Sequence, residues 1–259
     1  AAHQNLDGAL YLAISQSGKS PDLVRHAQSA RAAGARVVAL VNHADSPLAK
    51  VAETVIPLHA GPEISVAATK SYICSLAAIL HLAARWRDDA VLLDALFAVP
   101  QSLQRGWDMD WSPLVDGLAD ARNLFVIGRG FGFGAALEAA LKFKETCALH
   151  AEAFSAAEVR HGPMALVDKD FPVLFFSQND DTRDGTLALA REFRGRGARV
   201  LVAAPGADAD PLPVPESAHP ACTPLLTIQS FYRATSALSL RRGLDPDVPP
   251  HLRKVTETV

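Results

Sequence analysis

The sequence has 259 residues, of which 49% are hydrophobic and 20% charged, a composition typical of a globular protein and not of a disordered one. The net charge is −3 and the basic residues form no stripe, so we expect no nucleic-acid partner. The longest apolar runs are too short to cross a bilayer, which excludes a membrane-spanning role. Cys74, Cys147 and Cys222 are few and far apart and no signal-peptide pattern opens the chain, so we expect a cytoplasmic location.

The first segment that suggests a binding site is a predicted strand followed directly by a serine-rich turn. The apolar residues 9–14 predict the strand, SQSGKS follows at 15–20, and Pro21 predicts the first turn of a helix, where its missing N–H has no helical partner. Hydroxyls, free backbone N–H groups and the positive end of the helix dipole would then meet at one spot. This arrangement predicts a cradle for an anion such as phosphate, the alternative being a turn that only caps the helix.

A strand, a turn containing Ser-Gln, a helix, Gly-Ala-Arg and a second strand occur twice in the sequence. The first copy opens with residues 12–18 and closes with 34–40, and the second opens with 174–180 and closes with 197–203. Apolar strands that alternate with helices predict parallel sheets covered on both faces. We therefore predict an α/β fold of two similar domains, residues 1–105 and 106–259.

Further elements extend both halves. We expect a short strand at 54–57, a helix from about Val66 to Arg85, a helical stretch over 88–118 with a linker around 106–113, and a helix at 224–242. The second half also has a strand at 123–127 and a long helix before its Ser-Gln turn. By symmetry we expect that the chain begins inside a domain and that roughly 50 residues or more of the first domain precede it.

The glycine-rich run GRGFGFG at 128–134 invites comparison with a dinucleotide-binding turn. The third glycine of that fingerprint would have to stand where Phe133 is, and no acidic residue follows at the required distance. The run instead favours a tight turn with close packing of a strand on a helix. We expect neither NAD nor any other cofactor.

The helix after this run carries Glu138, Lys142 and Glu145 at spacings of four and three, so the three residues share one face. Almost every other position is Ala, Leu or Phe, the pattern of a buried helix, while Lys144 lies off this face and is expected to reach solvent. A row of charges is usually a solvated stripe of small energetic value. In so apolar a helix it can instead line a cavity for acid–base chemistry.

Two other polar residues are ambiguous on their own. Glu158 and His161 form a single Glu-x-x-His pair, whereas a di-metal bundle site needs two, so we expect no metal. His161 precedes Gly-Pro on a predicted turn, where it is either a proton shuttle or an ordinary surface histidine. Lys254, near the end of the chain, is expected to be solvated unless other evidence involves it.

Together these segments resemble the sugar isomerase (SIS) domain family, in particular the isomerase portion of glucosamine-6-phosphate synthase and stand-alone SIS-type deaminases. The resemblance rests on SQSGKSPD at 15–22, GPEISVAATKSY at 61–72, GRGFGFGAALEAALKFKE at 128–145, HAEAFSAAEVRHGP at 150–163 and HLRKVT at 251–256. It implies two SIS domains, each a parallel sheet flanked by helices in three layers, as in flavodoxin-like folds.

The resemblance also implies roles for individual residues. Those that would bind the phosphate of a hexose 6-phosphate are Ser15, Gln16, Ser17 and Ser20. Val66 would line the sugar pocket through its backbone, and Lys254 would close over the sugar and could form an imine with a ketose carbonyl. The turn at 177–181 carries two acidic residues that would repel phosphate, so we expect one working cradle per chain.

The acid–base roles fall on the second half. The resemblance implies that Glu145 moves a proton between C1 and C2 of the open-chain sugar, while Glu138 and Lys142 orient the sugar and tune that carboxylate. His161 would help to open the sugar ring and in this family often reaches the neighbouring subunit's site, which implies a homodimer. Proton transfer beside a carbonyl does need a positioned carboxylate and an electrophile.

Two family features do not occur in this sequence: a phosphate-contacting serine from the first βα turn, and the glutaminase domain of the synthase. If the native protein lacks that domain, glutamine cannot supply ammonia. We then expect conversion of glucosamine 6-phosphate to fructose 6-phosphate and ammonia. The alternatives are a fructosamine-6-phosphate deglycase, a trimmed glutamine-dependent synthase, and a non-catalytic phosphosugar sensor, against which the complete acid–base set counts.

Overall fold

The structure, a computed structural model, describes residues 4–206 and 210–254. They form two compact units: one contains the chain up to Ile79 together with the segment that starts at His251, and the other is Leu80–Pro250. The division predicted at residue 105 stays a prediction. No helix in the described ranges is long and apolar enough to cross a membrane.

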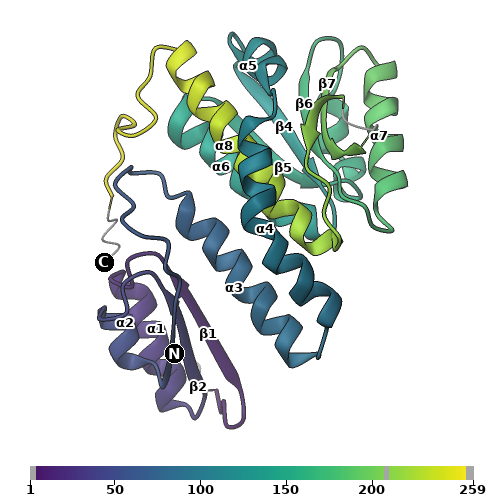
Figure 1. Cartoon of the computed structure of the whole chain (residues 1–259). Coiled ribbons are helices and arrows are strands. Elements are labelled where there is room, and N and C mark those ends of the chain that lie inside the picture. The colour runs from purple at the N-terminus through teal and green to yellow at the C-terminus, as the bar shows by residue number, and fades with distance from the viewer. Residues whose placement is uncertain (1–3, 207–209, 255–259) are drawn as a thin grey trace. The chain divides into compact units, whose positions relative to one another are not determined.

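The first unit is built on a three-stranded parallel sheet of order β1-β2-β3 (Figure 1). Its strands are β1 (Leu10–Ser15), β2 (Arg36–Val41) and β3 (Thr54–Pro57), and its first helices are α1 (Pro21–Ala32) and α2 (Pro47–Val51). These bounds confirm the predicted strands and the helix start at Pro21.

The central strand β2 explains why its sequence is apolar without alternation. Val37, Ala39 and Val41 point to one face of the sheet, where they pack with Ala27 of α1 and Leu48 of α2. The residue between two of them, Leu40, is fully buried as well. A parallel strand buried on both faces requires such a continuous run.

Helix α3 (Lys70–Trp86) begins four residues later than the predicted start at Val66. Residues 65–67 form a bend instead of a helical turn. The Glu63 carboxylate accepts hydrogen bonds from the backbone N–H groups of Thr69 (2.8 Å) and Ser71 (3.2 Å), and this fixes where the helix starts. The predicted start was wrong because the sequence pattern alone did not reveal this cap.

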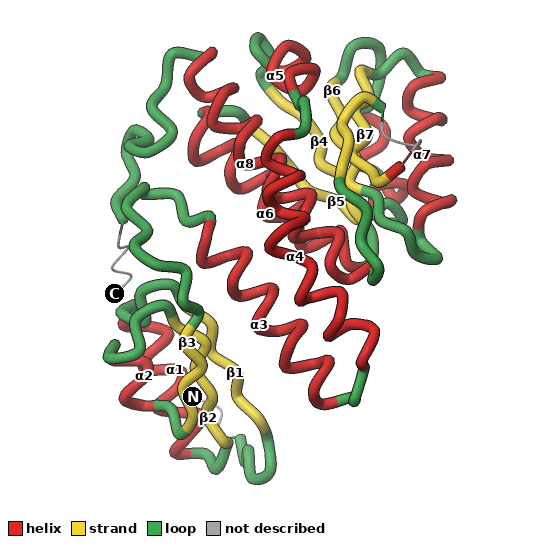
Figure 2. The backbone as a smooth tube through the Cα atoms, viewed as in Figure 1, coloured by secondary structure: helices red, strands yellow, loops and turns green. Residues whose placement is uncertain are grey.

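The second unit contains a five-stranded parallel sheet of order β5-β4-β6-β7-β8 (Figure 2). Its strands are β4 (Asn123–Gly128), β5 (His150–Ser155), β6 (Pro172–Phe176), β7 (Arg199–Pro205) and β8 (Pro211–Val214). Strand β5 was not predicted. It lies at the sheet edge, where exposed His150 and Glu152 alternate with buried Ala151, so its sequence lacks the apolar run of a central strand.

Helices lie on both faces of this sheet. Those of the second unit are α4 (Ala90–Asp108), α5 (Ser112–Leu118), α6 (Phe131–Cys147), α7 (Arg183–Gly195) and α8 (Thr223–Arg241), with short 3-10 helices η1 (Glu158–His161), η2 (Pro163–Leu166) and η4 (Pro220–Cys222). Phe175 of β6 packs on Phe193 of α7, whereas its neighbour Phe176 faces Phe231 of α8. Successive side chains point to opposite faces, so α7 and α8 form the two outer layers.

The linker predicted around 106–113 is shorter than expected, because only residues 109–111 separate α4 from α5. Gly106 lies inside α4, and its carbonyl accepts a hydrogen bond from Ser230 Oγ of α8 at 2.8 Å. A Cβ at Gly106 would lie 3.2 Å from that hydroxyl. The glycine therefore allows two helices to approach closely and does not end α4.

Candidate active site

The turn between β1 and α1 is closed by its own serines. The Gly18 N–H donates to Ser15 Oγ at 3.0 Å, and the Lys19 N–H donates to Ser17 Oγ at 3.3 Å. Gly18 has a φ of 61°, and a Cβ there would lie 2.2 Å from Ser46 Oγ. Glycine is therefore required at this position for both conformation and space.

Ser20 lies at the N-terminus of α1, yet its side chain makes no capping hydrogen bond. Ser46, in the same position before α2, does cap its helix by accepting from the Ala49 N–H at 3.3 Å. A turn that served only as a helix cap would use Ser20 as α2 uses Ser46. The structure thus places Ser15, Gln16, Ser17 and Ser20 on one turn at the positive end of a twelve-residue helix.

The corresponding turn after β6 is occupied by its own side chains. Buried Gln178 places Nε2 2.8 Å from both Arg129 O and Asp180 Oδ2. The other oxygen of Asp180 accepts from the Thr182 N–H at 2.9 Å and the Thr182 hydroxyl at 2.6 Å. The Gln178 amide and the Asp180 carboxylate therefore bind each other and neighbouring groups of Arg129 and Thr182.

On α6, Lys142 lies between two carboxylates. Its Nζ is 3.3 Å from Glu138 Oε1 and 2.5 Å from Glu145 Oε2. The side chains of Glu138 and Lys142 are 8% and 5% exposed, whereas that of Glu145 is 24% exposed. This row is therefore not a solvated stripe: two of its members are buried and only Glu145 is partly accessible. Lys144 is exposed, as predicted.

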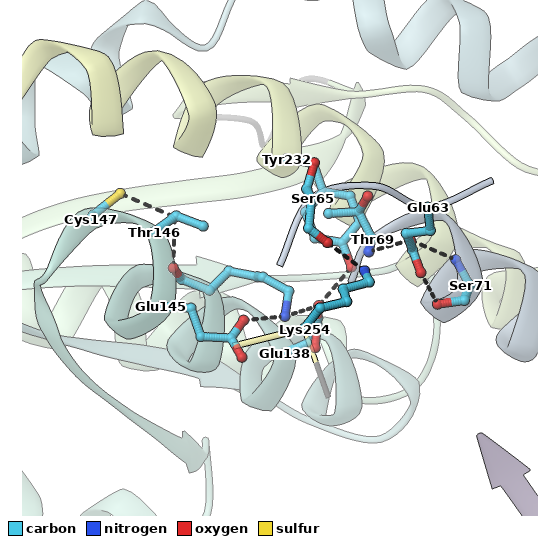
Figure 3. A network of polar contacts seen from close by, with 11 residues as sticks. Glu63, Ser65, Thr69, Ser71, Glu138, Glu145, Thr146, Cys147, Tyr232 and Lys254 are labelled. Carbon is cyan, nitrogen blue, oxygen red and sulfur yellow. Dashed lines mark hydrogen bonds and ion pairs between the residues drawn. The ribbon is translucent and has the colours of Figure 1, made fainter. Parts of the chain in front are cut away.

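Tyr232 of α8 joins this row and was not identified from the sequence. Its hydroxyl donates to Glu138 Oε1 at 2.7 Å (Figure 3). Burial raises the pKa of Glu138 above its ordinary value, and the charge of Glu145 adds to the rise, while Lys142 and the Tyr232 hydroxyl only partly offset it. A single tyrosine in an apolar helix gave no sequence signal for a polar role.

A second polar network lies in the first unit, around the loop before α3 (Figure 3). In addition to the two backbone N–H groups, the Glu63 carboxylate accepts from Ser71 Oγ at 2.6 Å. Burial raises the pKa of Glu63, but the Ser71 hydroxyl, the two N–H groups and the charge of Lys254 outweigh burial, so the pKa lies below its ordinary value. The sequence analysis missed Glu63, because this residue lies seven positions before the start of α3 and reaches the helix through a loop.

Lys254 and Val66 meet at this same loop. Lys254 Nζ donates to the carbonyl of Ser65, the residue before Val66. Val66 is half-buried within the bend. The structure therefore brings two of the predicted sugar-contacting residues together and shows that Lys254 is not simply solvated.

His161 is exposed at the end of η1, next to Gly162, whose φ of 147° permits the turn. No hydrogen bond or ion pair links it to Glu138, Lys142 or Glu145 in the described part of the chain. The same ranges contain no group of three or more His, Cys, Asp or Glu residues that could hold a metal ion.

Comparisons with known proteins agree with these observations. Two curated relatives are the glutamine–fructose-6-phosphate aminotransferases [isomerizing] of Thermotoga maritima and Methanothermobacter thermautotrophicus, 34% and 35% identical over 265 and 257 residues. Each alignment covers 96% of this chain but only 44% and 43% of the relative. The chain thus spans less than half the length of these relatives and corresponds to the part of them that contains the SIS domains.

Solved structures give the same result. A candidate phosphosugar isomerase from Silicibacter pomeroyi is 44% identical, with a TM-score of 0.87, over 95% of this chain and 76% of that one. The C-terminal domain of glucosamine-fructose-6-phosphate aminotransferase from Francisella tularensis is 25% identical, with a TM-score of 0.80, over 94% and 74%. A model of the SIS domain matches residues 6–85 and 117–211, which are more than half of the sequence. The chain therefore belongs to the SIS domain family, as its motifs predicted.

Proposed function

We propose that this chain is an SIS-family enzyme that isomerises amino-hexose 6-phosphates and converts glucosamine 6-phosphate to fructose 6-phosphate and ammonia. The observation that carries the proposal is the partly exposed Glu145 carboxylate, held 2.5 Å from the ammonium of buried Lys142. A carboxylate that is fixed in place yet accessible is what proton transfer next to a carbonyl requires. The names of the curated relatives, which include fructose 6-phosphate and isomerisation, support the same substrate class.

Glu145 is the proposed base. It removes the proton from C2 of the open-chain amino sugar, the C1 oxygen is protonated, and the proton returns at C1. This yields a ketose imine at C2. Water adds to the imine carbon and ammonia leaves, which gives fructose 6-phosphate. Lys142 stabilises negative charge that develops during the transfer, and Glu138 holds Lys142 in place.

The first unit supplies the proposed binding groups. The turn formed by Ser15, Gln16, Ser17 and Ser20 binds the phosphate, because its hydroxyls and the N-terminus of α1 favour an anion. Val66 offers its backbone to the sugar. Lys254 stabilises a ketose by charge or by forming an imine, which is a stronger electron sink than a carbonyl.

His161 is the proposed group for opening the sugar ring. Its exposed position and the absence of a bond to the α6 row fit a residue that serves the site of a second copy of the chain. The proposed active form is accordingly a homodimer.

A second candidate reaction is synthesis. The curated relatives are aminotransferases that are more than twice as long as the matched region, so the isomerase portion of such an enzyme would look similar. In synthesis, the chain would start from fructose 6-phosphate and from ammonia provided by another domain. The proton transfer between C1 and C2 would then run in the opposite direction.

The test is product formation by purified protein supplied with glucosamine 6-phosphate, measured as ammonia and fructose 6-phosphate together. Glu145→Gln keeps the shape of the side chain and should abolish turnover, while Lys144→Gln, the exposed neighbour, should retain it. Turnover only of a fructosamine 6-phosphate would replace the proposal by a deglycase. Sugar-phosphate binding without any turnover would indicate a sensor, and activity unaffected by Glu145→Gln would exclude that residue as the base.

A further inference from the structure

One oxygen of Glu138 receives donors from two different helices. Lys142 Nζ, one turn away on α6, is 3.3 Å from Glu138 Oε1, and the Tyr232 hydroxyl of α8 is 2.7 Å from the same atom. Glu138 is buried, with an exposed fraction of 8%. A buried carboxylate needs such donors to remain charged, because burial alone favours its neutral form.

Tyr232 lies next to an aromatic contact that joins α8 to α6. The Tyr232 ring lies 6.2 Å from that of Phe231, and Phe231 in turn meets Phe143 of α6 edge to face at 5.0 Å. Both phenylalanines are fully buried. These contacts hold α8 against α6, so the Tyr232 hydroxyl reaches Glu138 from a helix that packs directly on α6.

We propose that Tyr232 is a positioning residue of the α6 row: its hydroxyl holds the Glu138 carboxylate ionised and directed at Lys142, so that one ammonium binds Glu138 and Glu145 together. Without this bond, the charged form of Glu138 would be less favoured and its carboxylate less firmly directed at Lys142, so the ammonium would be held less firmly relative to Glu145. The catalytic consequence rests on the function proposed above, whereas the effect on Glu138 does not.

The groups that act on Glu138 are few. Lys142 and Glu145 come from α6 itself, and Tyr232 comes from α8. Among the strands packed against α6, β4 and β6 contain no titratable side chain, and those of β5, His150 and Glu152, are exposed. The Tyr232 hydroxyl lowers the pKa of Glu138, so its removal should raise that pKa further.

The experiment is a titration of the Glu138 carboxyl by carbon-13 NMR, with selectively labelled glutamate and assignment through Glu138→Gln. Tyr232→Phe removes the hydroxyl and keeps the ring. We expect the Glu138 pKa to rise in Tyr232→Phe and to stay unchanged in Tyr11→Phe, which removes a hydroxyl from β1. An unchanged Glu138 pKa in Tyr232→Phe would overturn the proposal, and so would failure of this variant to fold, since the hydroxyl would then have a structural role.

Turnover gives a second, independent measure. In Tyr232→Phe we expect kcat to fall about tenfold with KM within about twofold, and the acidic limb of the rate profile to move to higher pH. In the Glu138→Gln background the same change should add little, because Tyr232 acts through Glu138. Fully additive losses would contradict the proposal. If the wild type turns over no sugar phosphate, the proposed function fails, and the NMR titration still decides the role of Tyr232.

Discussion

The ammonium of Lys142 lies 2.5 Å from Glu145 Oε2, one helical turn along α6, and it also reaches Glu138. A buried cation shared by two carboxylates stabilises a charge arrangement that neither acid would maintain alone. The consequence is a coupling between stability and protonation in this helix, which can be measured by removing the lysine.

Lys142→Met should destabilise the protein by about 3–5 kcal/mol at about pH 7, because it leaves Glu138 buried without its cation. Burial already raises the pKa of Glu138, and loss of Lys142 raises it further. A raised carboxyl pKa means that the folded state binds the proton more readily than the unfolded state, so lowering the pH relieves the penalty. Urea unfolding at about pH 7 and about pH 5 should show a smaller deficit at the lower pH.

Lys144→Met is the matched control for this measurement. Lys144 is exposed two residues away on the same helix, so its loss should change the free energy of unfolding by less than about 0.5 kcal/mol. An equal deficit for Lys142→Met at both pH values would show that Glu138 titration is not the cause.

Substitutions in and beside the turn after β1 should affect either substrate binding or protein stability, depending on the residue. Ser20→Ala removes a hydroxyl that caps nothing, so we expect unchanged thermal stability and a KM for the sugar phosphate raised about tenfold or more. Ser46→Ala removes a working cap and should cost about 1 kcal/mol of stability. Gly18→Ala should destabilise strongly, because a Cβ there meets Ser46 Oγ. A stability loss in Ser20→Ala without any change in KM would contradict the phosphate role.

Arg242 ties together the ends of two helices. Its Nε donates to the carbonyl of Cys147 at the end of α6 (2.9 Å), and its NH1 lies 2.8 Å and 2.9 Å from the carbonyls of Ala119 and Ala121. Arg242→Ala would leave these carbonyls without their donor, so we expect a loss of about 3 kcal/mol. The neighbouring Arg241 is exposed and its ion pair with Asp116 is long, at 3.8 Å, so Arg241→Ala should have almost no effect. Equal losses in chemical denaturation would contradict this assignment.

If His161 serves the site of a second copy, two inactive variants should complement one another. A mixture of His161→Ala and Glu145→Gln chains, unfolded and refolded together, would contain mixed dimers in which one site has both residues intact. We expect activity to return to a fraction of the wild-type value in the mixture but not in either variant alone. Mixed dimers that form without any recovery would place His161 in the site of its own chain.

The sequence predicted most of the fold because apolar strands and helix caps are local signals. The Pro21 start of α1 and the bounds of β3 required no tertiary information. Strand β5 was missed since an edge strand alternates in polarity, and the start of α3 was misplaced since Glu63, seven residues upstream, caps it through a loop.

The candidate site was predictable only along single helices and turns. The shared face of Glu138, Lys142 and Glu145 follows from helical periodicity, which the ion pairs confirm. Tyr232 lies 94 positions away from Glu138, and Lys254 lies 189 from Ser65. Contacts over such separations depend on how elements pack, and no local pattern encodes them.

The hydrogen bonds to Glu63 should make part of the free energy of unfolding depend on pH. The pKa of Glu63 is lowered from its ordinary value of 4.5, so the unfolded state binds the proton first as the pH falls. The contribution of Glu63 is therefore present above about pH 4.5 and lost as the pH falls through the lowered value.

Because the group is only partly buried, we expect Glu63→Gln to cost about 1 kcal/mol at about pH 7. Unfolding curves of the wild type and this variant should converge in acid, whereas those of the wild type and Glu152→Gln, an exposed change on β5, should coincide throughout. A deficit for Glu63→Gln that persists undiminished in acid would show that lost packing, and not the ionised carboxylate, is responsible.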